Sequence, residues 1–358
     1  LPTFAGGDAI TAHVLSLRRV LRAAGYESEI FADDVRPEGR PHARHYSKFK
    51  PSPGEAPAWL LYHLSIGSPL ADFVMEQART QPLAVYYHNI TPARYFERWN
   101  PEAAERVRAG RAQMRKLASH SRFALAASTY NAAELEAEGY PHAAVAPIVI
   151  NFSEYGAPPD GVTLARLRRQ AETGGARWLF VGRIAPHKCQ HDVIGAFAVY
   201  RALFDPAARL YLVGGKASEL YFRALEMLVA ELGIADAVDF AGLVTPPELL
   251  AYYRSAEVFV SLSEHEGFCV PLLEAMHFGI PVVARGVAAV PVTVGDAGLL
   301  LPGNDPVLAA TAVDAVLSDD SLRECLVSAG HQRVSTYALE RTAARVLDLF
   351  GSRGTEVA

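Results

Sequence analysis

The second half of the chain alternates short apolar runs with longer stretches whose apolar residues recur every three or four positions. The short runs are rich in β-branched and aromatic residues, as buried parallel strands are, and the longer stretches are typical of amphipathic helices. This alternation predicts an α/β unit in which helices cover both faces of a parallel sheet. The predicted strands are 178–181, 210–213, 238–241, 258–262 and 281–284, and the clearest predicted helices are 192–204 and 219–232.

The first half shows the same pattern more faintly, with predicted strands at 59–62, 83–87 and 123–127. A stretch rich in proline and glycine at 151–176 predicts a domain boundary. We therefore expect a first domain at 1–155, a linker at 156–176, a second domain at 177–335 and a C-terminal helix at 336–358. Only five residues precede the glycine pair Gly6-Gly7, so the strand expected before this loop is predicted to be missing or trimmed.

The predicted strands of the second half end in glycines, cations and carboxylates. In parallel α/β sheets, ligands bind beyond the carboxyl ends of the strands. Those ends therefore predict a ligand site, and they carry Gly182-Arg183, Gly214-Gly215-Lys216, Gly242-Leu243-Val244, the 264–267 loop and Arg285-Gly286. The predicted strands of the first half end at His63, His88 and Ser128.

The best candidate for an active site is the strand-to-helix junction within 263–276. Glu266 and Glu274 stand eight residues apart there, with Gly267 in the loop and Pro271 where a first helical turn tolerates proline. The start of such a helix presents unpaired N–H groups and a partial positive charge, which suit a phosphate. Taken alone, the two carboxylates are more often solvated residues of a loop and a helix surface, so their meaning depends on the other motifs.

The junction resembles the Glu-x7-Glu signature of the retaining glycosyltransferases with the GT-B fold, in particular those of family four. Gly182-Arg183 followed by Lys188 is similar to the strand end that holds the donor diphosphate in that family. Gly6-Gly7-Asp8 resembles its first glycine-rich loop, and His88 stands where the family keeps an active-site histidine. The resemblance spans nearly the whole chain. One residue departs from it, because Cys269 stands where the family often has glycine and could narrow the approach to the donor sugar.

The resemblance implies a GT-B fold, with two Rossmann-like domains facing each other across a cleft. It also implies transfer of a sugar, with retention, from a GDP-mannose-like, UDP-sugar or dTDP-sugar donor. The implied acceptor is a glycan, a lipid-linked glycan or a natural product, such as a growing lipopolysaccharide or other bacterial surface polysaccharide. The implied catalytic residues are His88, Glu266, Arg183 and Lys188. The implied donor-binding residues are Gly6, Gly7, Gly182, Arg183, Lys188, Gly214, Leu243, Val244, Glu266, Gly267, Phe268, Cys269, Val270 and Glu274.

In the implied reaction, negative charge develops on the leaving diphosphate, where fixed cations and backbone N–H groups stabilise it. Arg183 can grip phosphate oxygens at two points, and Lys188 supplies a compact charge. With the helix end they can replace a metal ion, and the chain has no Asp-x-Asp, so neither a metal nor a cofactor is expected. By the resemblance, Glu274 binds the nucleotide ribose, Glu266 binds the donor sugar, and His88 lies near the donor sugar and the acceptor.

Two other functions remain open, a nucleotide-sugar epimerase on the same fold and a catalytically silent sugar-nucleotide-binding protein. Dinucleotide-binding, P-loop and α/β-hydrolase motifs are missing, so those enzyme classes lose their main support. His63 is more readily explained as a hydrogen-bonded histidine at a strand end. His187, Cys189 and His191 are too few, and unusually spaced, for a zinc site.

Length and charge agree with this picture. The 358 residues suit about two domains, and the net charge of −5 does not suggest a nucleic-acid partner. Residues 1–170 carry 20 Lys and Arg against 17 Asp and Glu, and the remainder carries 14 against 22. Much of the first half's positive charge lies in 94–122, which is either a solvated face or a surface for an anionic acceptor or membrane. Three cysteines without framework spacing and no apolar run of transmembrane length predict a cytoplasmic protein.

Overall fold

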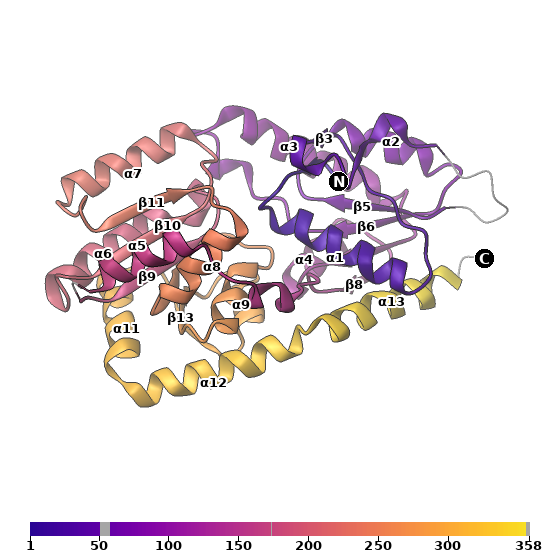
Figure 1. The fold of residues 1–358 in the computed structure, drawn as a ribbon. Coiled ribbons are helices and arrows are strands. Elements are labelled where there is room, and N and C mark those ends of the chain that lie inside the picture. Colours follow the sequence, from indigo (N-terminus) through magenta and orange to yellow (C-terminus); the bar gives the residue numbers. More distant parts are fainter. Residues whose placement is uncertain (51–57, 173, 356–358) are drawn as a thin grey trace. The chain divides into compact units, whose positions relative to one another are not determined.

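The fold was analysed in a computed structural model, which describes residues 1–50, 58–172 and 174–355 (Figure 1). The chain divides into two compact units. The first unit contains residues 1–97, 101–151 and 337–358, and the second contains residues 98–100 and 152–336. Each unit is described by itself.

A six-stranded parallel sheet forms the centre of the second unit. Its strands are β9 (Arg177–Val181), β10 (Arg209–Val213), β11 (Val238–Gly242), β12 (Val258–Ser261), β13 (Val282–Arg285) and β14 (Gly298–Leu301). They lie in the order β11-β10-β9-β12-β13-β14, so β9 and β12 are neighbours at the centre of the sheet. Residues of β9 and β12 are buried on both faces, as expected for strands covered by helices on both sides.

The helices of the second unit begin at clear sequence signals. Ser218 and Asp305 cap two of them by accepting a hydrogen bond from a first-turn N–H group, and Thr245 with Glu248 forms a capping box. The elements are η4 (Phe152–Gly156), α5 (Gly161–Ala171), η5 (Pro186–Lys188), α6 (Gln190–Leu203), α7 (Glu219–Glu231), α8 (Pro246–Ser255), α9 (Val270–His277), α10 (Val290–Val294), α11 (Pro306–Ser318) and α12 (Asp320–Thr336).

The core of the second unit lies between the sheet and these helices. Trp178 of β9 is fully buried and packs edge-on against Phe197 of α6, with ring centroids 5.5 Å apart. Trp99, from the short segment 98–100, packs against the same core, and its carbonyl accepts a hydrogen bond from Ser218 Oγ at 2.6 Å. This segment therefore belongs to the second unit although its neighbours in sequence belong to the first.

The first unit is built on a four-stranded parallel sheet, whose strands β5 (Leu60–Leu64), β6 (Leu83–Tyr87), β7 (Phe123–Ala126) and β8 (Ala143–Val145) lie in sequence order. Two short parallel pairs accompany it, β1 (Thr3–Phe4) with β3 (Asp34–Val35) and β2 (Phe31–Ala32) with β4 (Arg44–His45). The remaining elements are α1 (Ala9–Ala23), η1 (Pro37–Gly39), η2 (Tyr46–Lys48), α2 (Pro69–Gln77), η3 (Ala93–Tyr95), α3 (Pro101–Ala118), α4 (Thr129–Ala137) and α13 (Leu339–Thr355).

The final helix, α13, packs on the first unit. Val346 and Leu349 on one of its faces are buried. The ring of Phe350 meets the ring of Phe123 edge-on, with centroids 5.5 Å apart, and Arg345 donates a hydrogen bond to the carbonyl of Val145 at 3.4 Å. Residues at the far end of the sequence thus complete the unit in which the chain begins.

The structure differs from the sequence-based expectations at three places. Thr3–Phe4 form a strand before the glycine-rich loop, although it is only two residues long. The expected linker at 156–176 contains α5, which belongs to the second unit because Arg166 bonds Asp239 and Tyr252 there. The unit boundary accordingly falls at 151/152 and not at 155/156.

None of the helices in the described part of the chain has the length and apolarity that crossing a membrane requires.

Candidate active site

The strand order of the second unit creates a natural ligand site. From β9 the chain adds β10 and β11 on one side, and it then returns to add β12, β13 and β14 on the other. Connections leave β9 and β12 in opposite directions, which opens a crevice beyond their carboxyl ends. Gly182 and Arg183 follow β9, and the loop with Glu266 follows β12, so the predicted residues meet at this place. We call it the switch-point edge.

At the switch-point edge, two glycines without side chains lie near the exposed cation Arg183. Gly182 and Gly214 have φ values of +152° and +148°, which favour glycine. A Cβ added to Gly214 would lie 2.0 Å from the carbonyl oxygen of Gly182, so only glycine fits. Arg183 is exposed, and no acidic side chain of the described residues forms an ion pair with it. This edge therefore offers close backbone approach and an available guanidinium, both of which suit an anion.

Lys188 and Glu266 form a nearly buried ion pair at the same edge. Lys188 Nζ lies 2.6 Å from Oε1 and 2.7 Å from Oε2 of Glu266, and the two side chains are 18% and 6% exposed. Lys188 is held by the short η5 helix that follows β9, and Glu266 by the loop after β12. The sequence predicted both residues at the site, and the structure shows that they contact each other.

Three hydrogen bonds anchor the loop that carries Glu266. The N–H of Glu264 donates to the carbonyl of His187 at 2.9 Å, and the carbonyl of Glu266 accepts from the N–H of Ala289 at 3.2 Å. Thr293 Oγ1 donates to the carbonyl of Phe268 at 2.6 Å. The loop is thus tied to η5 on one side and to α10 on the other. Gly267 and Phe268, which the sequence analysis expects to bind the donor, follow Glu266 in this anchored segment.

The start of α9 shows why Cys269 is an unusual residue at its position. Cys269 is the N-cap of α9 and has a φ of +69°, in the left-handed region, and Val270 and Pro271 form the first turn. A side chain in this conformation costs about 1–2 kcal/mol relative to glycine. A glycine would therefore fit this backbone better than the cysteine of this chain.

Two tyrosines hold the carboxylate of Glu274. Tyr155 donates to Oε1 at 2.6 Å and Tyr253 donates to Oε2 at 2.5 Å. Burial raises the pKa of Glu274, and the two phenol hydrogen bonds oppose this by stabilising the ionised form. The sequence analysis missed both tyrosines. Tyr253 lies on the apolar face of α8, where it looks like a core residue, and Tyr155 lies in η4 without any periodic pattern.

The remaining predicted donor-binding residues follow β11 or lie in the first unit. Leu243 and Val244 follow β11 at the edge of the sheet, and Leu243 is 74% exposed. Gly6 and Gly7 belong to the first unit, where the N–H of Gly6 donates to the carboxylate of Glu38 at 3.0 Å. In that contact, the N–H of the glycine-rich loop donates to an anionic oxygen.

In the first unit, His88 follows β6 in a rigid segment. Its backbone N–H donates to the carbonyl of Leu64 at 2.9 Å. The next residue, Asn89, has a φ of +89°, and its amide donates to Asn131 and Glu134 at 2.9 Å each. The sharp turn at Asn89 therefore fixes the position at which the chain leaves the sheet and at which His88 stands.

Three histidines of the first unit lie close enough to suggest a metal, since one ring nitrogen each of His13, His63 and His88 lies within 4.8 Å of the others. His13 does not fit this use. The N–H of Val149 donates to its Nδ1 at 2.9 Å, so the neutral ring carries its proton on Nε2. A metal at Nε2 would need that nitrogen bare, and the chemistry of the three donors therefore disfavours a metal centre.

A second group of possible ligands, Cys189, His191 and Asp192, lies at the start of α6. The sequence had placed His187 with Cys189 and His191, but the structure brings Asp192 to this group instead. Burial raises the pKa of Cys189 to about 12. The residue is therefore a thiol at neutral pH, and thiols are poor metal ligands.

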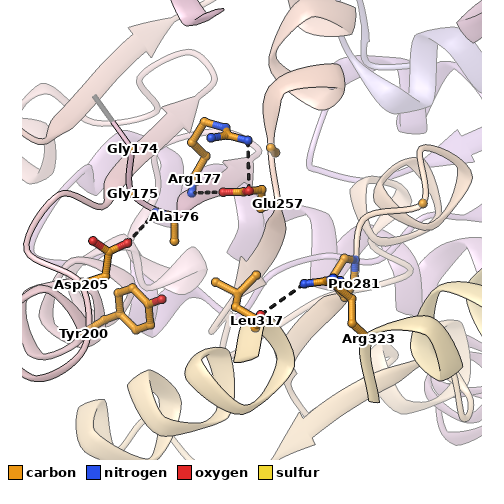
Figure 2. Close-up of a pocket in the computed structure, with 12 residues that line it drawn as sticks. Gly174, Gly175, Ala176, Arg177, Tyr200, Asp205, Glu257, Pro281, Leu317 and Arg323 are labelled. Carbon is orange, nitrogen blue, oxygen red and sulfur yellow. Dashed lines mark hydrogen bonds and ion pairs between the residues drawn. The ribbon is translucent and has the colours of Figure 1, made fainter. Parts of the chain in front are cut away.

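A pocket at the opposite edge of the second sheet has a different character (Figure 2). It lies at the amino ends of β9, β10, β12 and β13, and its charged groups are already satisfied within the protein. Arg177 pairs with Glu257 at 3.1 Å, and Asp205 accepts the N–H of Ala176 at 2.6 Å. Arg323 donates to the carbonyl of Leu317 and pairs with Asp320. These contacts leave little for a ligand.

Much of the basic stretch 94–122 is internally paired. Arg108 pairs with Glu97 and Glu105, Arg111 pairs with Glu134 at 3.0 Å, and Arg115 pairs with Glu138 at 3.2 Å. These pairs reduce the net positive potential of α3 below that suggested by the number of its arginines.

The second unit has cations, glycine backbone and anchored carboxylates at its switch point, which is the place where open α/β sheets bind ligands. Residues 166–333, which lie in the second unit, match the family described as "Glycosyl transferases group 1". The match excludes the first unit.

Individual glycosyltransferases are also similar to this chain in sequence. The chain is 35% identical to a D-inositol 3-phosphate glycosyltransferase of Corynebacterium urealyticum over 181 residues, which make up 49% of this chain and 43% of the relative. It spans less than half the length of the curated D-inositol 3-phosphate glycosyltransferases that it matches.

The fold is GT-B. It resembles sucrose-phosphate synthase of Thermosynechococcus elongatus with a TM-score of 0.77 and 23% identity, over 99% of this chain and 96% of that one. It also resembles HepE of Anabaena, solved with UDP and glucose, with a TM-score of 0.74 and 17% identity, over 98% of each chain.

Proposed function

We propose that the chain transfers a sugar from a nucleoside diphosphate donor to an acceptor hydroxyl with retention of configuration, without a metal ion. The observation that carries the proposal is the switch-point edge, where Arg183, the Lys188–Glu266 pair and the start of α9 come together on bare glycine backbone. This set combines cations and N–H groups for a diphosphate with fixed carboxylates for hydroxyl groups.

The chemistry follows from where charge develops. As the bond between the anomeric carbon and the β-phosphate oxygen breaks, that oxygen gains negative charge, and Arg183 and Lys188 stabilise it together with the first N–H groups of α9. The acceptor oxygen bonds to the anomeric carbon on the same face of the sugar. Its proton passes to an oxygen of the leaving diphosphate, so the step balances without a separate base.

The carboxylates and the histidine bind the hydroxyl groups of the donor. Glu274, held by Tyr155 and Tyr253, retains accepting lone pairs for the hydroxyls of a ribose. Glu266 binds the hydroxyls of the donor sugar in this proposal, and its contact with Lys188 orients the lysine. The family resemblance assigns His88 a hydrogen bond to a hydroxyl of the donor sugar.

The comparisons favour a uridine nucleotide and a small acceptor. HepE was solved with UDP and glucose, and the curated relatives act on an inositol phosphate by name. We therefore propose a UDP-sugar donor and a phosphorylated polyol acceptor, with a surface or lipid-linked glycan as the second candidate. Contact of 94–122 with a membrane belongs to that second candidate, and the ion pairs of Arg108, Arg111 and Arg115 weaken it.

Calorimetric titration of UDP, GDP, dTDP and ADP into the purified chain, without added metal, tests the donor site. We expect micromolar binding of UDP that is lost in Arg183→Ala and retained in Arg323→Ala, whose arginine lies at the opposite edge of the sheet. Binding of none of the four by a folded sample contradicts the proposal. Incubation with the UDP-sugar alone distinguishes the transferase from an epimerase, because only the epimerase converts the donor without an acceptor. Release of UDP on adding acceptor distinguishes the transferase from a silent binding protein, which releases none.

A further inference from the structure

The loop that joins β12 to α9, residues 262–269, depends on α10 for its shape. The N–H of Ala289 donates to the carbonyl of Glu266 at 3.2 Å, and Oγ1 of Thr293 donates to the carbonyl of Phe268 at 2.6 Å. Thr293 is completely buried, so water cannot take over its hydrogen bond if the hydroxyl group is removed. Two carbonyls of the loop are therefore held by α10 and its N-cap residue.

The hydrogen bond from Thr293 also fixes the peptide group between Phe268 and Cys269. All peptide bonds of the described residues are trans, and in a planar trans peptide the C=O and N–H groups point in opposite directions. The carbonyl of Phe268 faces Thr293, so the N–H of Cys269, the N-cap of α9, faces away from it. Cys269 has a φ of +69°, a conformation that a residue with a side chain keeps only where its surroundings enforce it. Without its anchor, this peptide group would be free to rotate.

Arg333 of α12 holds α10 in place. With five residues, Val290–Val294, α10 is far shorter than the roughly 12–15 residues that an isolated helix needs, and its last carbonyls have no partner within the helix. Nε of Arg333 donates to the carbonyl of Thr293 at 2.9 Å, and the same guanidinium donates to the carbonyl of Val292. The arginine packs on Gly295, where an added Cβ would lie 3.4 Å from Nε. The guanidinium thus completes the end of α10 from outside.

The contacts close on themselves through α9. Gly330 of α12 lies directly against Met276 of α9, since a Cβ added to this glycine would be 3.2 Å from Cγ of the methionine. The loop is thus bound to α10, α10 to α12 and α12 to α9, and α9 continues the loop. All of these elements belong to the second unit. A closed set of contacts of this kind orders the loop in advance of any ligand.

We propose that Thr293 and Arg333 are positioning residues, which hold the 262–269 loop in its donor-binding shape before the nucleotide arrives. Thr293 acts through the carbonyl of Phe268, and Arg333 acts through α10 on Thr293. This inference rests on the proposed function, in which the loop and the start of α9 bind the donor. A loop that is already ordered loses less freedom on binding, so the two anchors raise the affinity for the nucleotide without touching it.

Hydrogen exchange of the full chain without nucleotide tests the order of the loop. Thr293→Val replaces the hydroxyl by a methyl group of similar size, and Thr293→Ser keeps the hydroxyl. We expect Thr293→Val to speed the exchange of amides 264–269 and 289 about 10-fold or more, because the buried carbonyl of Phe268 loses its donor, and Thr293→Ser to restore most of the protection. Unchanged exchange in Thr293→Val overturns the proposal even if the chain transfers no sugar, so the two failures are distinguishable.

Calorimetric affinity for UDP tests whether this order serves the donor. We expect Thr293→Val to weaken the affinity about 10-fold and Thr293→Ser to recover most of it. Thr342→Val is the matched control, because Thr342 is also buried but its hydroxyl bonds the carbonyls of Ala338 and Leu339 in its own turn, and it should change neither quantity. Native UDP affinity in Thr293→Val, together with lower stability in urea, would show that Thr293 is purely structural.

The role of Arg333 is tested by combining substitutions. Arg333→Met removes the guanidinium and keeps much of the side-chain length, and we expect it to speed the exchange of the loop about as much as Thr293→Val does. The double variant should then exchange little faster than either single one, because both act through the same hydrogen bond. Fully additive effects would show that Arg333 does not act through Thr293. If Arg333→Met does not fold, Arg333→Lys, which replaces the planar fork by a single point charge, gives the same comparison.

Discussion

The tyrosine hydrogen bonds to Glu274 lead to a prediction with a characteristic dependence on pH. Tyr253 is 1% exposed and donates to Oε2, so Tyr253→Phe removes the hydroxyl, preserves the ring packing and leaves that oxygen without its donor. A hydrogen bond to a charged group contributes about 1.5–3 kcal/mol, and one to a neutral group about 1 kcal/mol. We therefore expect the free energy of unfolding to fall by about 2 kcal/mol at a pH above the raised pKa of Glu274, where its carboxylate is ionised.

The loss should shrink in acid. Burial already raises the pKa of Glu274 above its ordinary value of 4.5, so the folded protein binds a proton more readily than the unfolded chain and stability falls as the pH rises from 4.5 through the raised pKa. Removing the phenol raises that pKa further and widens this window. Near pH 4.5, where Glu274 is largely protonated, the cost of the substitution should approach about 1 kcal/mol.

Urea unfolding at several pH values between about 4.5 and 7 measures this difference. Tyr252→Phe is the matched control, because Tyr252 is also buried on α8 but accepts its hydrogen bond from Arg166, which does not titrate in this range. Tyr253→Phe in a Glu274→Gln background should lose the pH dependence. A cost of Tyr253→Phe that is independent of pH, like that of the control, would refute the assignment of Glu274 as a buried carboxylate held ionised by two phenols.

Four further predictions concern the site. Cys269→Gly should change stability by less than about 1 kcal/mol, because relief of the left-handed backbone offsets the entropy of glycine, whereas Cys269→Val should cost at least about 2 kcal/mol; equal thermal shifts for the two would contradict this. Lys188→Ala should cost about 3–5 kcal/mol in urea unfolding, because it leaves the buried Glu266 unpaired, and far less when Glu266 is already Gln; an equal cost in both backgrounds argues against a coupled pair. Gly214→Ala should destabilise by more than about 3 kcal/mol, since its Cβ would overlap a carbonyl oxygen, and a thermal unfolding curve like that of the native chain would be inconsistent with the backbone described. His88→Ala should lower turnover with little change in calorimetric UDP affinity, and an equal loss of nucleotide binding would mean that its assignment is wrong.

The sequence predicted the second unit better than the first. Its strands are mostly apolar and its helices carry caps and prolines, so every central strand was found and only β14, which begins at a glycine, was missed. Arg183, Lys188 and Glu266 were named as candidate site residues because they follow predicted strands and match the family's motifs. In the first unit, β8 is only three residues long and gave no recognisable pattern.

The residues that the sequence did not indicate act through contacts distant in the chain. Tyr155 reaches Glu274 across 119 residues, and His13 meets Val149 across 136. Neither residue interrupts its local pattern, since a buried tyrosine or histidine is compatible with an ordinary core. Only the fold shows that each places a polar atom against another polar atom of the site.

The first unit uses both ends of the chain, and this sets the order in which the units can mature during synthesis. Residues 152–336 form nearly all of the second unit as one continuous stretch, whereas the first unit lacks α13 until residues 337–355 have been made. At a translation rate of about 5–20 residues per second, the first unit waits about 10–40 s after residue 151 for its last helix. During that interval the surfaces of Phe123 and Val145 that meet α13 stay uncovered. The unit synthesised first is therefore the last to be completed, and a chain truncated before α13 would expose that surface to chaperones and aggregation.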